Sequence, residues 1–343
     1  MKTIFADKHV LHDPGIEVDG GRIETCAEKP SRTETVRKAI ADNNIGAIIA
    51  PGSYGIDKIT AIHNADYIEF LRTAHGAWLE SGREGPAFAT NFNSQHHSQT
   101  PPQAIGGRMG FYICDTSVSL TAGSWEAAEQ GAHAALTALD CVIGGDKAAF
   151  SLSRPPGHHA SAGMGGGYCL LNNAAIAAQA FIDGGHGQKV AILDVDYHHG
   201  NGTQDIFYQR SDVLYASLHA DPAVDFPYFL GYAQEIGAGA GAGFNHNYPM
   251  PLGTTWERYR EALRNALQKI NDFGADLLIV SLGVDTYKDD PISQFKLDSP
   301  DYITMGADIA GLSRPTLFVM EGGYAVDAIG TNVVNTLNGY SGS

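Results

Sequence analysis

Residues 190–200 read VAILDVDYHHG, and the fold class can be inferred outward from them. It opens with four consecutive apolar residues, which is typical of a short strand covered on both faces, as in a parallel sheet. Polar residues begin where the apolar run ends, at Asp194, Asp196 and His198. Because side chains alternate along a strand, these three face one side and the two residues between them face the other. The stretch therefore predicts a buried strand that delivers carboxylates and an imidazole to its carboxyl end.

Strand and helix patterns alternate over the rest of the chain, and we expect strands at 1–7, 45–50, 148–152, 190–196, 213–218, 277–285 and 316–321. Helices are expected at 31–44, 66–80, 124–143, 172–183, 256–272, 299–312 and 327–337. Ser31 with Glu34 has the spacing of a capping box, and Ser299-Pro300 has a capping hydroxyl before a first-turn proline. The alternation predicts an α/β fold with a doubly wound, mostly parallel sheet and helices on both faces. With no linker or repeat, we expect one domain over residues 1–343.

One long segment, residues 81–110, does not continue the alternation of strands and helices. It is rich in Gly, Pro, Gln, Ser and His and has no clear periodicity. Loops of this length in compact domains are usually functional or disordered. We therefore expect a rim loop over the active site or a contact between subunits.

Composition excludes several classes of protein. The 22 Lys and Arg against 38 Asp and Glu give a formal net charge of −16, which opposes binding to nucleic acid. The four cysteines are far apart and form no CxxC pair, as in reduced cytosolic proteins. No stretch reaches the length of a membrane span, and the first residues lack a signal-peptide pattern. We expect a cytoplasmic protein that does not bind membranes.

A metal site is predicted at the strand ends. Asp196 and His198 can reach one divalent cation, and a third ligand, Asp285, closes the buried strand at 277–285. Two carboxylates and one imidazole with open positions are what a catalytic metal site requires. Capping or turn roles would explain each residue taken alone, and spacing does not prove that Asp285 joins the other two.

Proton-transfer groups follow two further strands. His158 and His159 sit on a Pro-Gly turn after 148–152, and histidine carries protons near neutral pH. His96 and His97 form a second pair, but no strand precedes them, and we interpret them as solvated. Tyr324 follows 316–321 and two glycines, where its hydroxyl could donate to an oxyanion, although a packed tyrosine is the simpler interpretation.

These motifs occur together in an order that resembles the zinc-dependent histone deacetylase superfamily and, within it, the bacterial acetylpolyamine amidohydrolase group. The stretches that carry the resemblance are 154–159 (RPPGHH), 166–168 (GGY), 194–203 (DVDYHHGNGT), 281–285 (SLGVD) and 321–324 (EGGY), supported by 226–232 (FPYFLGY) and 289–293 (DDPIS). The resemblance implies the arginase–deacetylase fold. It also implies Zn²⁺ on Asp196, His198 and Asp285, with Fe²⁺ as a possible substitute.

By position, the resemblance implies that His159 is the general base and that His158, held by Asp194, is its electrostatic partner. Tyr324 matches the oxyanion donor. Other matching positions are Gly167, whose carbonyl would accept the substrate N–H, and the tunnel walls Tyr168 and Phe226. Structural K⁺ is implied at two places: Asp194, Asp196, His198, Ser217 and Leu218, and then Phe207, Arg210 and Val213.

Two features depart from the family pattern. Asn201 stands where many members have Asp, so His159 would lack a charged orienting partner. Acidic residues that could bind a distal ammonium are sparse in the rim region, where Asp115 is the only one between 99 and 116, with Glu17 as a second candidate.

The resemblance implies hydrolysis of acetylated polyamines or diamines, such as acetylputrescine, acetylcadaverine or acetylspermidine, by a homodimer. A protein lysine deacetylase is the alternative for the same chemistry. Arginase-like ureohydrolysis would need a carboxylate-rich two-Mn²⁺ cluster, and ligands for one metal are found. A non-enzymatic metal-binding protein would have no need of the paired histidines and Tyr324.

Overall fold

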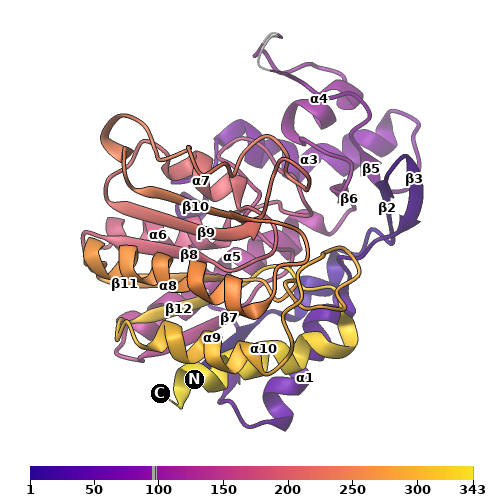
Figure 1. Cartoon of the computed structure of the whole chain (residues 1–343). Coiled ribbons are helices and arrows are strands. Elements are labelled where there is room, and N and C mark those ends of the chain that lie inside the picture. The colour runs from indigo at the N-terminus through magenta and orange to yellow at the C-terminus, as the bar shows by residue number, and fades with distance from the viewer. Residues whose placement is uncertain (95–96, 98, 343) are drawn as a thin grey trace.

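The computed structural model describes residues 1–94, 97 and 99–342. Within them, one eight-stranded sheet has the order β10-β9-β8-β11-β12-β7-β1-β4, and every neighbouring pair is parallel (Figure 1). The strands are β1 (Lys2–Phe5), β4 (Ile48–Ile49), β7 (Ala148–Leu152), β8 (Val190–Asp194), β9 (Val213–Ala220), β10 (Asn245–Met250), β11 (Leu277–Leu282) and β12 (Thr316–Met320). The predicted parallel sheet is confirmed.

Helices cover both faces of this sheet, and strand alternation explains how. Val190 and Ile192 of β8 enter one apolar core, while Ala191 and Leu193 enter the other. The first core is closed by α3 (Ala65–Glu80), α5 (Ser124–Ile143) and α6 (Asn173–Asp183). The second is closed by α1 (Pro30–Asp42), α8 (Trp256–Phe273), α9 (Asp301–Ala310) and α10 (Val326–Ser341), which cross the lower front in Figure 1. The continuous apolar runs are thus strands buried on both faces.

Several short elements were not expected from the sequence. They are η1 (Asp7–Leu11), β2 (Ile16–Asp19), β3 (Arg22–Thr25), α2 (Asp57–Thr60), β5 (Ala87–Phe88), α4 (Ile105–Tyr112), β6 (Ser119–Leu120), α7 (Asn201–Phe207) and η2 (Gly239–Gly241). The edge strand β10 of the main sheet was not expected either. β2 and β3 form an antiparallel hairpin, and β5 pairs with β6. The segment 81–110 therefore contains a short strand and the start of a helix.

Both expected helix starts differ from the structure. α1 begins at Pro30 with Lys29 as its N-cap, so Ser31 and Glu34 form no capping box. Glu34 Oε2 accepts a hydrogen bond from Arg37 Nε at 2.8 Å, and Glu34 Oε1 lies 3.1 Å from His9 Nε2. α9 begins at Asp301, whose carboxylate accepts the backbone N–H of Asp298 at 2.7 Å. In neither helix does the N-cap side chain make a capping hydrogen bond.

The loops that follow β7, β8, β11 and β12 gather at one edge. These four strands are neighbours in the sheet order, so their carboxyl ends lie side by side. In open α/β sheets, ligands bind in the crevice beyond such ends. The fold therefore brings the predicted strand-end residues to one place.

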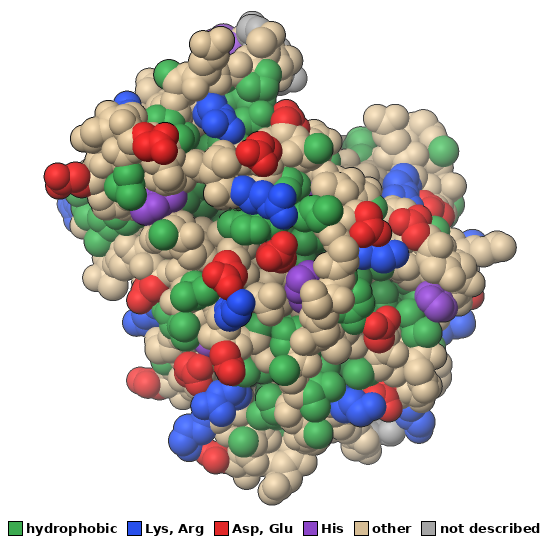
Figure 2. Space-filling model, turned by 180° about the vertical axis from the view of Figure 1, so that it is seen from behind, with side chains coloured by type: hydrophobic (Ala, Val, Ile, Leu, Met, Phe, Trp, Pro, Cys, Tyr) green, Lys and Arg blue, Asp and Glu red, His purple; other side chains and the backbone are tan. Residues whose placement is uncertain are grey.

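In the described part of the chain, no helix is long and apolar enough to cross a membrane. The face shown in Figure 2 has acidic and basic side chains interspersed, with no broad patch of basic residues. A phosphate backbone requires such a patch.

Candidate active site

A pocket of about 590 Å³ opens at the carboxyl edge of the sheet. Its wall is built from segments far apart in the sequence: Glu17, Asp19, Glu24, Thr25, Ala27, Asp115, Thr116, Ser117, His159, Gly167, Tyr168, His198, Asp225, Phe226, Tyr228, Pro291, Ile292 and Tyr324. Most of the predicted catalytic and substrate-binding residues thus line a single cavity. No described residue of 81–110 lines the pocket within this one chain.

Asp196, His198 and Asp285 form a compact donor set below this pocket. All three are buried, and their ligand atoms lie within 4.8 Å of one another. His198 Nδ1 is 3.0 Å from Asp285 Oδ2 and 3.3 Å from Asp196 Oδ1. Burial and the charge of Asp196 raise the pKa of Asp285 to about 7, and a cation would relieve this cost. The donor set fits a single divalent metal ion.

Glycine is required beside these ligands. A Cβ on Gly322 would lie 2.5 Å from an oxygen of Asp196 and 2.5 Å from an oxygen of Asp285. The Gly322 backbone N–H instead donates to Asp196 Oδ2 at 2.8 Å. The paired glycines before Tyr324 therefore give the backbone direct access to the metal-binding carboxylates.

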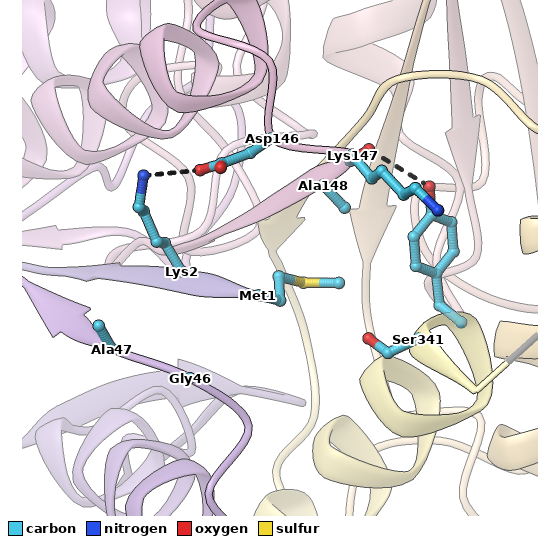
Figure 3. Close-up of a pocket in the computed structure, with 9 residues that line it drawn as sticks. Met1, Lys2, Gly46, Ala47, Asp146, Lys147, Ala148 and Ser341 are labelled. Atoms are coloured by element: carbon cyan, nitrogen blue, oxygen red, sulfur yellow. Dashed lines mark hydrogen bonds and ion pairs between the residues drawn. The ribbon is translucent and has the colours of Figure 1, made fainter.

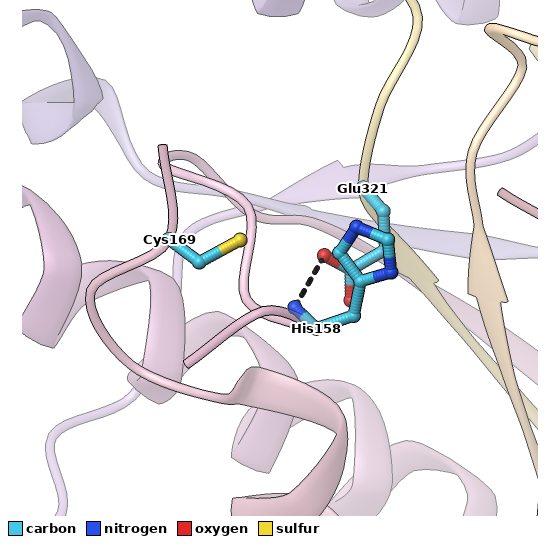
Figure 4. Close-up of side chains that lie close together, drawn as sticks. All are labelled: His158, Cys169 and Glu321. Atoms are coloured by element: carbon cyan, nitrogen blue, oxygen red, sulfur yellow. Dashed lines mark hydrogen bonds between the residues drawn. The ribbon is translucent and has the colours of Figure 1, made fainter. Parts of the chain in front are cut away.

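A second buried group, His158, Cys169 and Glu321, also brings three donor atoms together (Figure 4). Several of its donors are already engaged, because Glu321 Oε2 accepts the backbone N–H groups of Gly157 and His158 and His158 Nδ1 lies 3.0 Å from Asp194, whereas Glu321 Oε1 has no hydrogen-bond partner among the described residues. The Cys169 thiol donates to the Gly167 carbonyl, and burial raises its pKa far above the usual range. A thiol that stays protonated is a poor metal ligand. This group supports the histidine turn and does not resemble a metal centre.

The two adjacent histidines lie in different electrostatic environments. Burial opposes protonation of His158, but the charges of Asp196 and Asp194 outweigh it and raise its pKa to about 10. His158 Nδ1 lies 3.0 Å from Asp194 Oδ2. Burial, followed by the charge of His158, lowers the pKa of His159 well below its usual value. One imidazole is thus charged and the other neutral, although the ring centroids are 3.9 Å apart.

Asn201 orients the neutral histidine. Its Oδ1 lies 2.7 Å from His159 Nδ1, so an N–H on Nδ1 donates to it and leaves Nε2 as the proton acceptor. Asn201 is the first residue of α7, which follows directly on the metal-ligand loop. The Asn201 amide therefore orients the His159 ring as a carboxylate would, but without adding a negative charge.

Tyr324 lies at the pocket wall and is 7% exposed. Burial raises the pKa of its phenol, so the hydroxyl keeps its proton and can donate a hydrogen bond. The Tyr168 ring lies 5.6 Å from the Tyr324 ring, between centroids, and forms part of the same wall.

The remaining walls are close to His159. The Phe226 ring meets the His159 ring edge-on at 4.9 Å. Gly167 has φ +49°, and a Cβ there would lie 2.3 Å from the His159 ring, so only glycine fits. The Gly167 N–H donates to Asp115 Oδ2 at 2.6 Å, which ties the pocket wall to the segment after α4.

Acidic residues at the pocket are more numerous than the sequence suggested. Glu17 and Asp115 line it as expected, and the structure adds Asp19, Glu24 and Asp225. Glu17 is 7% exposed, and burial raises its pKa, as does the charge of Asp19 to a smaller extent. The β2–β3 hairpin, which carries Glu17, Asp19 and Glu24, was not expected from the sequence. The spacing of these charged residues was the one sequence feature that could have indicated it.

The residues assigned to K⁺ fall into two groups. Asp194 and Ser217 are register partners on β8 and β9, and Leu218 follows on the same strand. The Ser217 hydroxyl lies 2.8 Å from His219 Nδ1. The second group consists of Phe207 at the end of α7, Arg210 in the turn that follows and Val213 at the start of β9.

A separate hollow of about 360 Å³ lies at the opposite, amino edge of the sheet (Figure 3). Its charged side chains include Lys2 and Asp146, which pair with each other at 2.9 Å. None of the predicted site residues lines it. The outer histidine pair is also remote from the chemistry: His97 is exposed, and His96 lies outside the described residues.

Comparison with known proteins agrees with this geometry. The sequence profile described as the histone deacetylase domain matches residues 26–340 of the chain. The chain belongs to the histone deacetylase domain family. It is therefore a hydrolytic deacetylase of a metal-dependent family, and the Asp196, His198 and Asp285 group is one that can hold a metal ion.

Similar members of the family match over almost their whole length. Acetylpolyamine amidohydrolase 1 of Pseudomonas aeruginosa is 51% identical, over 100% of this chain and 99% of that protein. Acetylpolyamine amidohydrolase of Mycoplana ramosa is 49% identical, over 100% of both. The crystal structure of acetylpolyamine aminohydrolase from Burkholderia pseudomallei superposes with a TM-score of 0.95 at 36% identity, covering 99% of this chain and 98% of that one. The predicted arginase–deacetylase fold is confirmed.

Proposed function

We propose that this deacetylase hydrolyses the acetamide of N-acetylated polyamines or diamines, of the acetylputrescine, acetylcadaverine or acetylspermidine type, to free amine and acetate. The observation that carries the proposal is the charge of the pocket wall. Five carboxylates line the pocket, and no lysine or arginine does so among the described residues. A chain of methylenes ending in an ammonium complements such a wall.

The hairpin supports a cationic substrate through its register. Glu17 and Glu24 are directly opposite each other on β2 and β3, and Asp19 lies two residues along from Glu17. Like charges directly opposite one another destabilise a hairpin. A bound ammonium would relieve this repulsion, so the pocket gains from the charge of its ligand. The names of the similar proteins, which describe acetylpolyamine hydrolysis, agree with this assignment.

Asp196, His198 and Asp285 would hold Zn²⁺, with Fe²⁺ as a possible substitute in cells. The bound metal would polarise the acetamide carbonyl and activate water. His159 Nε2 would take the proton from the attacking water, while Asn201 holds Nδ1. The same nitrogen would then return the proton to the leaving amine. The Tyr324 hydroxyl would donate to the oxyanion, and the charged His158 would favour that negative charge.

Substrate positioning follows from the walls. The Gly167 carbonyl would accept the substrate N–H, and the rings of Tyr168 and Phe226 would flank the methylenes. Glu17 and Asp115 would bind the distal ammonium together with the hairpin carboxylates. We further propose structural K⁺ at the two groups named above, and a single deacetylase domain over residues 1–343.

We also propose that the enzyme is a cytoplasmic homodimer. The segment 81–110 would form the contact between subunits and narrow the entrance. Phe92 in this segment is 41% exposed, and it lines a further hollow of about 270 Å³. A narrow entrance would admit a slender polyamine and exclude a folded protein.

Steady-state kinetics on two substrate types tests the proposal. Purified enzyme should have a higher kcat/KM on acetylputrescine, acetylcadaverine or acetylspermidine than on acetyl-lysine peptides. The opposite order would favour the alternative, a protein lysine deacetylase. Metal analysis of the same preparation should give one Zn²⁺ per chain, and two Mn²⁺ would point to arginase-like chemistry.

A further inference from the structure

Asp290 is a buried carboxylate that the catalytic roles above do not use. It lies in the loop that follows the metal ligand Asp285 and is 6% exposed. Its Oδ2 accepts the backbone N–H of Tyr324 at 2.6 Å and that of Ala325 at 3.1 Å. Its Oδ1 accepts the backbone N–H of Ile292 at 3.1 Å. One side chain therefore joins the metal-ligand loop to the backbone of the tyrosine.

The same turn is held from its other side by a buried guanidinium. Arg32 donates to the carbonyl of Gly323 at 2.5 Å and to that of Glu321 at 2.7 Å. Its guanidinium carbon lies 4.5 Å from the centroid of the Tyr324 ring. The Asp290 carboxylate thus binds the N–H groups of the turn, and the Arg32 guanidinium binds its carbonyls. Charge-assisted hydrogen bonds are roughly twice as strong as neutral ones.

These contacts with Asp290 and Arg32 matter because the turn before Tyr324 has little rigidity of its own. Gly323 has φ +121°, a conformation open to glycine and few other residues, and its neighbour Gly322 has no side chain to pack. Two successive glycines leave the backbone before Tyr324 free to adopt many conformations. The position of the hydroxyl then depends on what holds the peptide groups.

We propose that Asp290 is a positioning residue for Tyr324, which sets the place of its hydroxyl relative to the metal ligands. The inference rests on the proposed role of Tyr324 in acetamide hydrolysis. Because Asp290 holds Tyr324 at its own N–H, loss of that bond displaces the hydroxyl without touching the substrate. A displacement of about 1 Å at a reacting centre can cost about 100-fold in rate.

The test is Asp290→Asn, with Asp276→Asn as its matched control. Asparagine has no charge and only one oxygen for the three N–H groups that Asp290 binds. Its N–H₂ must face an N–H of either the turn or the loop, so the charge-assisted bonds that hold Tyr324 to the loop are weakened. Asp276 Oδ2 likewise accepts two backbone N–H groups, those of Gln188 and Lys189 at 2.8 and 3.0 Å. It lies before β11, at the amino edge of the sheet, far from the pocket.

We expect Asp290→Asn to lower kcat by about 10- to 100-fold, within the range for a weakened oxyanion donor, with KM and metal content unchanged. Asp276→Asn should leave kcat within about twofold, as a surface substitution does. The decisive measurement is the double variant with Tyr324→Phe. Once the hydroxyl is gone, Asp290→Asn should lower kcat by less than about twofold, because coupled residues are not additive.

An equal loss of kcat with and without the Tyr324 hydroxyl would overturn the proposal, as would loss of metal from Asp290→Asn. If that variant does not fold, Asp290→Glu takes its place in the same measurements, since it keeps the charge but shifts the oxygens by one methylene. It too should lower kcat only while the Tyr324 hydroxyl is present. Each variant is assayed on acetylputrescine and on an acetyl-lysine peptide. The fold-change in kcat caused by Asp290→Asn should be equal on both substrates. A higher kcat/KM of the wild-type enzyme on the peptide than on acetylputrescine would refute the polyamine assignment but not the role of Asp290.

Discussion

The replacement Asn201→Asp should move the acid limb of the pH–rate profile. The new carboxylate would stand where Asn201 Oδ1 now lies, 2.7 Å from His159 Nδ1. Unit charges about 4 Å apart, at an effective dielectric constant of about 20, attract by about 4 kcal/mol, which corresponds to a pKa change of roughly 3. The lost amide dipole and nearby solvent reduce this, so we expect the pKa of His159 to rise by about 1 to 3.

The neighbouring histidine shows the same direction of effect. Burial lowers the pKa of His158, but the charges of Asp196 and of Asp194, whose Oδ2 is 3.0 Å away, raise it to about 10. Burial and the charge of His158 hold the pKa of His159 well below its usual value. A general base works in its neutral form, so raising its pKa moves the acid limb of kcat/KM to higher pH. On the acid side of the new limb, kcat/KM should fall about tenfold each time the pH is lowered by one.

The assay is kcat/KM against pH for wild type, Asn201→Asp and Asn201→Ala. The alanine variant removes the acceptor without adding charge, so it should lower the plateau and leave the acid limb within about 0.5 pH of wild type. If the limb of Asn201→Asp coincides with that of wild type, His159 is not the group that titrates, and its assignment as the base is refuted.

Three further outcomes follow from the site. Tyr324→Phe should lower kcat by roughly 100- to 1,000-fold while metal analysis shows the ion retained, and unchanged turnover would remove the oxyanion role. Asp19→Asn and Glu24→Gln should each raise KM for acetylspermidine about two- to fivefold and leave an uncharged N-alkylacetamide unaffected, which steady-state kinetics would detect. Stripping the metal with a chelator should lower the melting temperature, because the buried Asp196 and Asp285 then repel each other. At a metal concentration about 1,000 times its Kd the lost stabilisation is about 4 kcal/mol, and an unchanged transition would contradict the assignment of the ligands.

Strand periodicity located the centre of the site because the determinants are local. Asp196 and His198 follow an apolar run, which predicts their place at the carboxyl end of a buried strand. The strand β8 ends at Asp194, however, so the following loop and not strand alternation brings them together, with the His198 N–H donating to Asp196 Oδ1 at 2.9 Å. Asp285 and Tyr324 end other strands, so their meeting depends on strand order, which periodicity does not specify. The resemblance to a known family supplied that order, and the structure shows these strands as neighbours.

Elements with polar sequences were missed for a physical reason. β10 contains Asn245 and Asn247, whose amides donate to Gln204 Oε1 at 2.9 and 2.8 Å, so polar side chains are satisfied inside the fold. It also contains Pro249, which an edge strand tolerates. The hairpin of β2 and β3 was missed because its place depends on contacts far along the chain, such as the Thr116 hydroxyl donating to the Val18 carbonyl at 2.7 Å. Such contacts leave no local periodicity.

The register between β8 and β11 also has a consequence for how the enzyme acquires its metal. Asp196 and Asp285 become neighbours only when these strands pair, with Ile192 opposite Ile279, although a long stretch of chain separates them. Pairing over such a distance is slow, since the loop must close before contacts compensate for its entropy. A nascent or partly folded chain would therefore hold the ion weakly and exchange it readily. Uptake of metal during refolding should report the moment at which the middle of the sheet closes, later than the formation of individual helices.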